Sequence, residues 1–251
     1  MDHRTPPDRD RAINAPRVVV VLIATFVAVH AVRMMLPDRQ GVWMLLAFAF
    51  IPARYADTAA YPPDFIPGGI GADYWSFVTH MFLHGDFTHL LVNCLWMLAF
   101  GTVVARRLPP GRFLVLSAVS GVAGALAHLA IYWGELVPVI GASAAISGQM
   151  GAATRFIFSA PGGLFHASRM HPAHVRVLGL LETFGTPNAL IFILVWVGLN
   201  FAMGLSGIAF LGEGQRIAWE AHIAGFFAGL AIFGPLDPWR RNFPSRQNVL
   251  H

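Results

Sequence analysis

Long apolar runs separated by short polar stretches dominate this chain. A helix needs about 20 predominantly apolar residues to cross the hydrocarbon core of a bilayer. Six stretches approach this length, namely residues 18–36, 86–105, 112–133, 143–158, 188–206 and 217–234. The pattern therefore predicts an all-α, polytopic membrane protein built as a bundle of six membrane-spanning helices.

The fourth stretch is shorter than the others. At about 1.5 Å per residue it reaches roughly 24 Å, whereas the hydrocarbon core is about 30 Å thick. We therefore expect its N-terminus to lie below the outer surface, so that the preceding residues 135–142 dip into the bilayer. Backbone of this kind is tolerated at such depth only where it is buried in protein or lines a water-filled cavity.

Another apolar piece, residues 42–51, lies between the first two spans and ends at Pro52. It is too short to cross, so we expect it at the membrane interface or on the outer side of the bundle, with Trp43 and Tyr55 as interfacial anchors. Residues 61–71 are rich in Pro and Gly and predict an irregular loop. The pair Gly85-Asp86 predicts a turn and an N-cap for the second span.

Composition agrees with a membrane protein, since 56% of the 251 residues are hydrophobic and 12% are charged. An ordinary soluble domain carries about 25% charged residues, and it rarely hides so many long apolar runs. The chain divides into a polar N-terminus (residues 1–16) without a convincing signal-peptide cleavage site, a membrane domain (17–236) and a tail (237–251). The single cysteine, Cys94, excludes an internal disulfide framework and a multi-cysteine metal site.

All 17 basic residues are arginines, and they lie between the apolar runs. If the N-terminus is cytoplasmic, only four face outward, and this bias predicts that both termini are cytoplasmic. The outward-facing arginines are Arg33, Arg39, Arg54 and Arg216. No nucleic-acid motif accompanies the arginines, so we expect the lipid bilayer as the partner and no nucleic acid. The absence of Lys beside abundant Ala, Gly and Arg indicates a GC-rich bacterial genome and hence a plasma membrane.

Polar residues gather near the outer ends of the second, fourth and sixth spans. Such residues inside spans normally face the bundle interior or a wet cavity, and they are functional candidates. For a single histidine, a packing role is equally reasonable, but a group at one depth favours a site. The group comprises His84, His89, Asn93, Ser143, Ser147 and His222.

Ser143 lies in the run GASAAISG, residues 141–148. At the first turn of a recessed helix it gains unpaired N–H groups and the positive end of the helix dipole, which suit an oxyanion. A serine nucleophile also needs a base, and His222 in the sixth span is a candidate. Gly225 and Gly229 form a GxxxG pair that lets a neighbouring helix come close, and Gly148 and Gly151 act similarly on span four. The alternative is that the GxxxG pair serves helix packing alone, with no catalytic purpose.

His89 and Asn93 are four residues apart and share one helix face. Their N–H groups, aimed at the top of span four, would complete an oxyanion site around the Ser143 N–H. The alternative is ordinary hydrogen bonding between helices, worth about 0.6 kcal/mol for each bond.

Three segments together resemble the rhomboid family of intramembrane serine proteases. HGDFTHLLVN (residues 84–93) resembles its second-span pattern, GASAAISG its nucleophile motif, and AHIAGFFAGL (residues 221–230) its sixth-span histidine motif. They occur in the expected order on the expected spans, and the resemblance covers residues 18–236.

The resemblance implies that Ser143 is the nucleophile and His222 the general base of a dyad without a carboxylate. His89, Asn93 and the Ser143 N–H would hold the oxyanion, and His84 would be a structural histidine. Supporting roles fall to Gly141, Ser147 and Gly225. The implied substrates are single-span membrane proteins that gain access beside spans two and five, and neither a metal nor another cofactor is implied.

Three positions depart from the family pattern. Ala144 follows the serine where Gly is common, which predicts slight crowding. Ser147 stands where some members place an aromatic ring against the histidine, and we expect it to hydrogen-bond His222 or a water instead. A frequent Trp-Arg pair is missing, because Trp75 is followed by Ser76.

Three alternatives remain. A zinc or haem protein is suggested by His80 and His84, four residues apart, but no HExxH motif or carboxylate accompanies them. His171 and His174 lie in a loop expected on the opposite side. An inactive rhomboid-like binding protein would usually lack the serine or the histidine, and a transporter would show inverted repeats.

Overall fold

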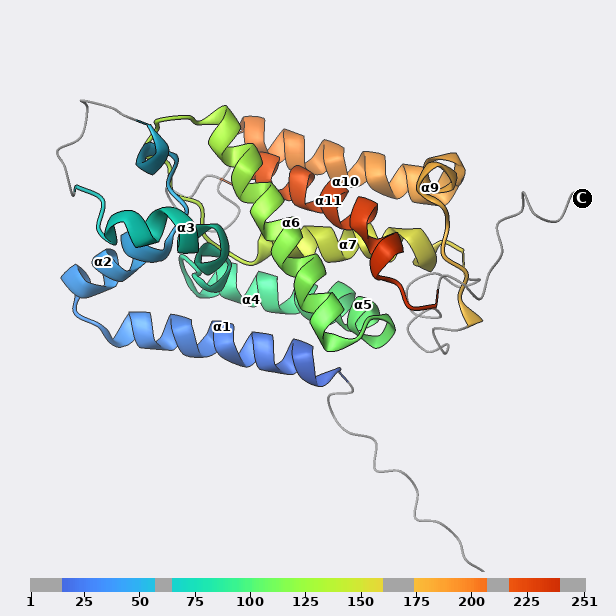
Figure 1. The fold of residues 1–251 in the computed structure, drawn as a ribbon, viewed down its shortest axis with the longest axis horizontal. Coiled ribbons are helices and arrows are strands. Elements are labelled where there is room, and N and C mark those ends of the chain that lie inside the picture. Colours follow the sequence, from blue (N-terminus) through green and yellow to red (C-terminus); the bar gives the residue numbers. More distant parts are fainter. Residues whose placement is uncertain (1–14, 57–64, 160–173, 207–216, 240–251) are drawn as a thin grey trace, which may run out of the picture.

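The computed structural model describes residues 15–56, 65–159, 174–206 and 217–239. These residues form helices and no named strand, and one isolated bridge pairs Phe50 with Val139. Figure 1 shows the helices in chain order. They are α1 (Arg17–Met35), α2 (Asp38–Phe48), η1 (Pro52–Tyr55), α3 (Gly69–Thr79), η2 (His80–Phe82), α4 (Phe87–Trp96), η3 (Met97–Gly101), α5 (Thr102–Arg107), α6 (Pro110–Ile131), α7 (Ser143–Ile157), α9 (Leu180–Gly185), α10 (Pro187–Ser206) and α11 (Trp219–Leu236).

The all-α prediction is confirmed, but the count of six spans is not met in full. Among the described residues, five helices are long and apolar enough to cross a membrane. They are α1, the continuous rod from Phe87 to Arg107, α6, α10 and α11. The remaining predicted span, the fourth, corresponds to α7, which has only 15 residues, about 22 Å at the usual rise. The rod contains one π-helical turn, η3, between α4 and α5.

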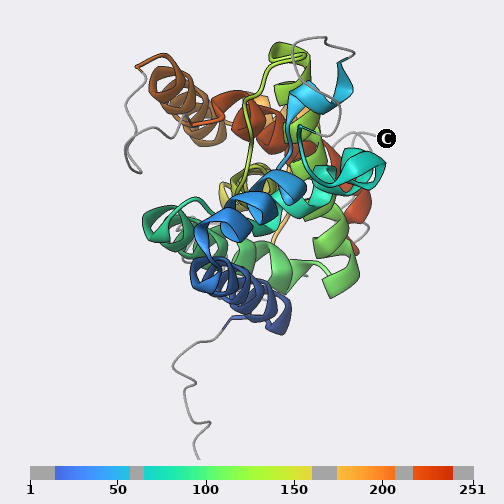
Figure 2. The same cartoon turned by 90° about the vertical axis from the view of Figure 1, so that its left-hand side faces the viewer.

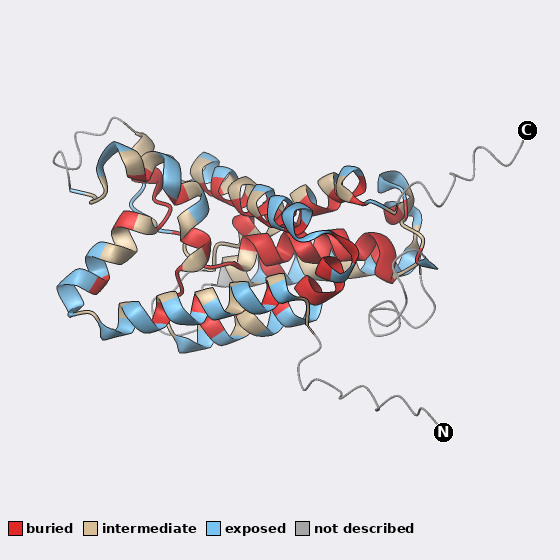
Figure 3. Cartoon of the chain, turned by 60° about the horizontal axis from the view of Figure 1, so that its bottom comes forward, coloured by how far each residue is buried: buried red, intermediate tan, exposed pale blue. Residues whose placement is uncertain are grey.

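The short helix α7 lies at the centre of the bundle. Every residue from Ala144 to Ile157 is buried, and Figure 3 shows the buried residues concentrated on the central helices. Helices α1 and α10 lie at opposite edges in both views (Figures 1 and 2), and only 17% of the residues in each are buried. A helix too short to cross the membrane alone is therefore enclosed by longer helices.

Small residues hold α7 against α11. A Cβ added at Gly225 would overlap the Ala144 carbonyl, and one added at Gly229 would overlap the Gly148 backbone. The same is true of Gly151, which faces the backbone of Phe226. The close contact that the GxxxG pattern predicts between spans four and six is present.

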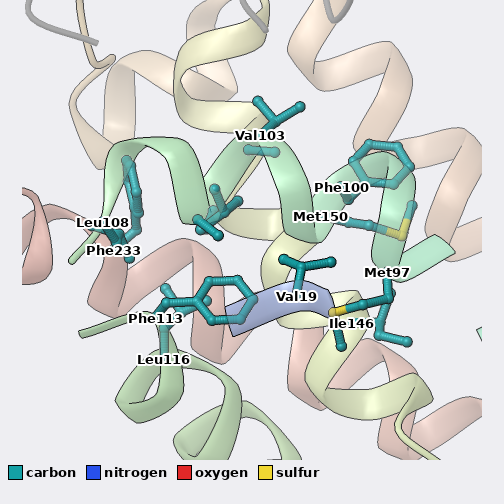
Figure 4. Packing of buried hydrophobic residues seen from close by; sticks show 14 of the residues in the cluster. Val19, Met97, Phe100, Val103, Leu108, Phe113, Leu116, Ile146, Met150 and Phe233 are labelled. Atoms are coloured by element: carbon teal, nitrogen blue, oxygen red, sulfur yellow. The ribbon is translucent and has the colours of Figure 1, made fainter. Parts of the chain in front are cut away.

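Large apolar side chains fill the space on the other side of α7. Figure 4 shows Met97, Phe100 and Val103 packed near Ile146 and Met150 of α7. Lipid tails are as apolar as these side chains, so in a membrane dense packing, more than transfer out of water, stabilises such a cluster.

Two buried arginines tie the helices together at the end of the bundle where α5, α7 and α11 terminate. Arg107 forms an ion pair with Asp237 at 3.0 Å, donates to the Val175 carbonyl at 3.0 Å and lies 5.2 Å from the Phe156 ring centroid. Arg155 donates to the carbonyl of Leu178. These contacts satisfy main-chain oxygens of the non-helical segment before α9.

The segment between α1 and α4 differs in part from its prediction. Trp43 on α2 is exposed, as expected of an interfacial residue. The Tyr55 hydroxyl donates to the Asp73 carbonyl at 2.8 Å and its ring stacks on Phe50, so its place at the membrane interface stays a prediction. In the predicted loop 61–71, helix α3 already begins at Gly69, while residues 61–64 lie outside the described residues.

The predicted polar tails and the loop containing His171 also lie largely outside the described residues. The described part of the C-terminal tail is residues 237–239, which include the buried Asp237.

Candidate active site

The first turns of α4, α7 and α11 meet at one end of the bundle. His89, Ser143 and His222 are the third, first and fourth residues of these helices, respectively. All three helices therefore direct their N-terminal ends, which are the positive ends of their dipoles, toward one region. This arrangement favours negative charge at the point where the three ends meet.

The structure brings Ser143 and His222 into direct contact. The Nε2 atom of His222 lies 2.8 Å from the Ser143 hydroxyl oxygen, although 79 positions separate the residues in the chain. Both side chains are half-buried. The geometry is that of a hydroxyl donating its proton to an imidazole, which is the arrangement that an activated serine nucleophile needs.

A third side chain contacts the imidazole from α10, and the sequence analysis missed it. The Nδ1 atom of His222 lies 2.9 Å from Oδ1 of Asn200. The Asn200 amide nitrogen donates to the Trp196 carbonyl at 2.8 Å, and the side chain is fully buried. The available signal was an amide within a strongly apolar span, the same signal that singled out Asn93.

His89 is held by one hydrogen bond at its backbone and one at its ring. Its backbone N–H binds the carboxylate of Asp86, the predicted N-cap, at 2.8 Å, and its Nδ1 accepts the Gly85 N–H at 3.4 Å. Accepting at Nδ1 leaves the proton on Nε2 in the neutral ring. A Cβ on Gly141 would lie 2.7 Å from this Nε2, and Gly141 has a φ of 112°. Both the space and the left-handed backbone therefore require glycine at position 141.

The loop before α4 is held by the end of α1. Arg33 donates to the carbonyls of His84 and Gly85 at 2.8 and 2.6 Å, and His30 lies 3.2 Å from the same His84 oxygen. The buried His84 ring packs edge-on against His89, with centroids 5.3 Å apart. Burial lowers the pKa of His84 to about 3, so this ring is neutral near pH 7.

Asn93 lies one turn below His89 on the same helix and is buried. Its amide nitrogen donates to the His89 carbonyl at 2.8 Å, and its side-chain oxygen has no hydrogen-bond partner. The cavity beside Ser143 is lined by His89 but not by Asn93. The structure thus places His89 and Ser143 on the same cavity, and Asn93 outside its lining.

Two departures from the family pattern have structural explanations. Of the two partners expected for Ser147, His222 is not the one it binds, since the Ser147 hydroxyl donates to the Ser143 carbonyl at 2.8 Å, four residues back along its own helix; a water as a further partner stays a prediction. Ala144 is accommodated by Gly124 of α6, where an added Cβ would lie only 2.7 Å from the Ala144 Cβ. The absence of a side chain at Gly124 relieves the predicted crowding.

A cavity of about 480 Å³ opens beside Ser143. Its polar lining comes from His89, His128, Ser143, Glu220 and His222, and apolar walls come from Leu45, Leu136, Val137, Pro138, Val139, Ile140, Ile217 and Ala218. Its volume falls within the range of small-molecule and cofactor sites, about 300–1,000 Å³.

Protein contacts satisfy the backbone of the loop that forms the cavity wall, residues 132–142. Val139 exchanges two hydrogen bonds with Phe50, and Gly141 donates to the His80 carbonyl at 2.9 Å. This agrees with the expectation that irregular backbone at this depth is buried in protein.

A buried pair that the sequence analysis did not identify also anchors this loop. His128 of α6 lies 2.6 Å from the Glu220 carboxylate and 3.0 Å from the Val137 carbonyl. Because a carbonyl only accepts, the His128 Nε2 carries a proton. The pair therefore links α6 and α11 to the loop above Ser143.

The histidines behind the metal hypothesis have other surroundings. His80 lies 2.8 Å from the Ser76 carbonyl, and its ring is fully buried near Phe50. Within the described ranges, no group of three His, Cys, Asp or Glu side chains has the spacing of a metal site.

Comparison with known proteins identifies similar sequences. A sequence model of the Rhomboid domain matches residues 71–236. Rhomboid protease GluP of Bacillus subtilis (strain 168) is 29% identical over 160 residues, which cover 64% of this chain and 26% of that protein. Rhomboid protease GlpG of Salmonella choleraesuis (strain SC-B67) is 26% identical over 230 residues, which cover 89% of this chain and 63% of that protein. Putative rhomboid protease YdcA of Bacillus subtilis (strain 168) is 31% identical over 133 residues, which cover 51% of this chain and 63% of that protein. The matches thus span less than two thirds of each relative.

Proposed function

This chain belongs to the rhomboid family, and from that membership we propose that it is an intramembrane serine endopeptidase. It is an integral membrane protein, with five described helices of membrane-spanning length and apolarity. The observation that carries the proposal is the 2.8 Å contact between Ser143 and His222 beside a cavity. An active serine hydrolase needs this pair, and either member alone would be inert.

In the proposed reaction the Ser143 oxygen attacks the carbonyl carbon of a substrate peptide bond. His222 accepts the hydroxyl proton at Nε2 and then donates it to the departing amine nitrogen, which leaves an acyl-enzyme. Water next enters, gives a proton to His222 and attacks the ester, and the serine regains its proton. The steps balance without a metal or another cofactor.

The tetrahedral intermediate carries an oxyanion that needs donors. We assign this role to the Ser143 N–H, the Nε2–H of His89 and the second amide N–H of Asn93. The first two are supported by the position of Ser143 at the start of α7 and by the His89 ring beside Gly141. The role of Asn93 is supported by its position on α4, one turn after His89 on the same helix face. Each such donor contributes about 10²–10³ to kcat.

The proposed substrates are single-span membrane proteins whose helix unwinds near the scissile bond, because a helical peptide bond is already engaged in hydrogen bonds. Substrates would reach Ser143 between α4 and α10. This path is supported by α10, which is among the least buried of the long helices.

We further propose a bacterial plasma membrane with both termini in the cytoplasm. The support is the arginine distribution: Arg107, Arg112 and Arg155 bind groups at the end of the bundle opposite the cavity. That end would face the cytoplasm, where arginine is enriched.

A labelled fluorophosphonate tests the proposal on the purified full chain. The wild type should be labelled, and Ser143→Ala and His222→Ala should abolish both labelling and cleavage of a reconstituted single-span substrate. Ser147→Ala is the matched control, since its hydroxyl only binds a carbonyl of its own helix, and it should retain labelling.

Two outcomes would contradict the proposal. Cleavage that persists in Ser143→Ala and stops on addition of a chelator would favour a metalloenzyme. A folded wild type that binds membrane proteins, yet is never labelled and cuts none, would indicate an inactive rhomboid-like binding protein.

A further inference from the structure

We propose that Asn200 is a positioning residue that holds His222 in the protonation state required of the base, so that the dyad works as a Ser143–His222–Asn200 triad. The inference rests on the proposed function. It starts from two distances: 2.9 Å between Asn200 Oδ1 and His222 Nδ1, and 2.8 Å between the Asn200 amide nitrogen and the Trp196 carbonyl.

The Trp196 carbonyl fixes the orientation of the Asn200 amide. A carbonyl accepts hydrogen bonds and never donates, so the group facing it must be the NH₂ of the amide. A flipped amide would place two oxygens against each other and lose this bond. Because Asn200 is fully buried, water would not compensate for that lost hydrogen bond.

The fixed amide in turn selects the tautomer of His222. With Oδ1 of Asn200 facing the ring, Nδ1 must carry the proton and donate it. In a neutral imidazole the other nitrogen, Nε2, then bears the lone pair, and Nε2 is the atom 2.8 Å from the Ser143 hydroxyl. The opposite tautomer would place an N–H against Ser143 and would be unable to take its proton.

Asn200 also has a role during the reaction. When His222 becomes an imidazolium, both ring nitrogens donate, and the bond from Nδ1 to Asn200 persists and strengthens because its donor is now charged. An amide lacks the charge of the aspartate in a Ser-His-Asp triad, so its contribution is orientation more than charge compensation.

No other described side chain holds the Nδ1 side of His222. The nearest candidate from the sequence, Ser147, is occupied with the Ser143 carbonyl. Asn200 comes from α10, a different helix from both Ser143 and His222, and thus links a third element to the pair.

Three variants of the full-length protein test the inference. Asn200→Leu keeps the approximate volume and removes both hydrogen bonds. Asn200→Asp retains an acceptor toward His222. Ile193→Ala is the matched control, because Ile193 is buried on α10 two turns away and packs in the hydrophobic core without touching the pair.

The measurements are kcat, KM, the rate of fluorophosphonate labelling and the ¹⁵N NMR spectrum of the histidine rings, with the His222 signal identified by its loss in His222→Ala. We expect Asn200→Leu to lower kcat and labelling by about 10²-fold with little change in KM. Asn200→Asp should have a kcat and a labelling rate at least about tenfold higher than those of Asn200→Leu. Ile193→Ala should lower thermal stability while leaving the rate per folded molecule intact. The wild-type spectrum should show the proton on Nδ1, and Asn200→Leu should show it redistributed.

Labelling of Asn200→Leu at the wild-type rate, or a wild-type spectrum with the proton on Nε2, overturns the inference. So does an equal loss of rate in Asn200→Leu and Ile193→Ala. A wild type that resists labelling altogether overturns the proposed function instead, and the spectrum then still decides the tautomer.

Discussion

Gly229 of α11 lies directly against the backbone of Gly148 in α7, so that a single added Cβ would overlap it. We expect Gly229→Ala to push the two helices apart, to destabilise the protein by about 1–3 kcal/mol through overpacking, and to separate Ser143 from His222. Gly198→Ala is the control, because a Cβ there meets nothing within 4 Å and alanine favours a helix. Thermal unfolding and fluorophosphonate labelling of both variants check this. Equal unfolding temperatures and equal labelling rates in the two variants would contradict the importance of the close contact between α7 and α11.

Gly141→Ala should disturb the site through the backbone. Its φ of 112° is unfavourable for alanine, which costs on the order of 1–3 kcal/mol, and the new methyl group would displace the His89 ring. We expect a large drop in kcat. Gly111→Ala, at a position with open space, should behave as wild type in the same assay. A fully active Gly141→Ala protein would argue against the assigned role of His89.

Asn93→Ala should lower turnover more than stability. Loss of one oxyanion donor reduces kcat by about 10²-fold or more, whereas the amide makes a hydrogen bond only to its own helix at His89. Gln149→Met, which removes a buried amide bonded to Ser117, is the matched control and should affect stability alone. If Asn93→Ala instead unfolds at lower temperature with an unchanged rate per folded molecule, Asn93 is structural.

Asp237→Ala should be strongly destabilising. It leaves the Arg107 guanidinium buried without its carboxylate, and breaking a buried pair in this way costs about 3–5 kcal/mol. Glu182→Gln weakens the half-exposed pair with Arg176 and should cost at most about 1 kcal/mol. Thermal unfolding of both variants in the same detergent compares them. A similar loss of stability in both would contradict the structural role of Arg107.

Trp96→Ala should speed the cleavage of membrane-embedded substrates. Trp96 contacts Trp196 of α10, with ring centroids 6.3 Å apart, and this contact holds α10 against α4. Such pairs contribute about 0.5–1.5 kcal/mol, which corresponds to roughly 2- to 12-fold in the population with α10 displaced. Leu95→Ala, at an exposed neighbouring position, should have no such effect. An unchanged rate in Trp96→Ala would argue for another access path.

The sequence predicted the helices and the central pair because each left a local signal. Apolar runs mark the helices, and Ser143 and His222 are polar residues in short motifs near helix starts. Proximity then followed from glycines that permit α7 and α11 to touch. The helices and the Ser143–His222 contact could therefore be predicted from the length of the apolar runs and the spacing of the glycines.

Contacts that depend on side-chain direction were missed or wrong. Asn200 belongs to no motif, and only the packing of α10 reveals that its amide meets His222. His222 was one of two partners expected for Ser147, the other being a water, but a serine in a helix readily bonds the carbonyl four residues back. His128 and Glu220, 92 residues apart, pair through a crossing of α6 and α11 that no local pattern encodes.

The edge position of α10 has a consequence for the surroundings of the protein. The helix that fixes the imidazole is also one of the two least buried long helices among the described residues, and in a membrane its tilt depends on the match between its length and the hydrocarbon thickness. Bilayers of different thickness should therefore tune proton transfer from a distance, so that the lipids behave as effectors without occupying a binding site.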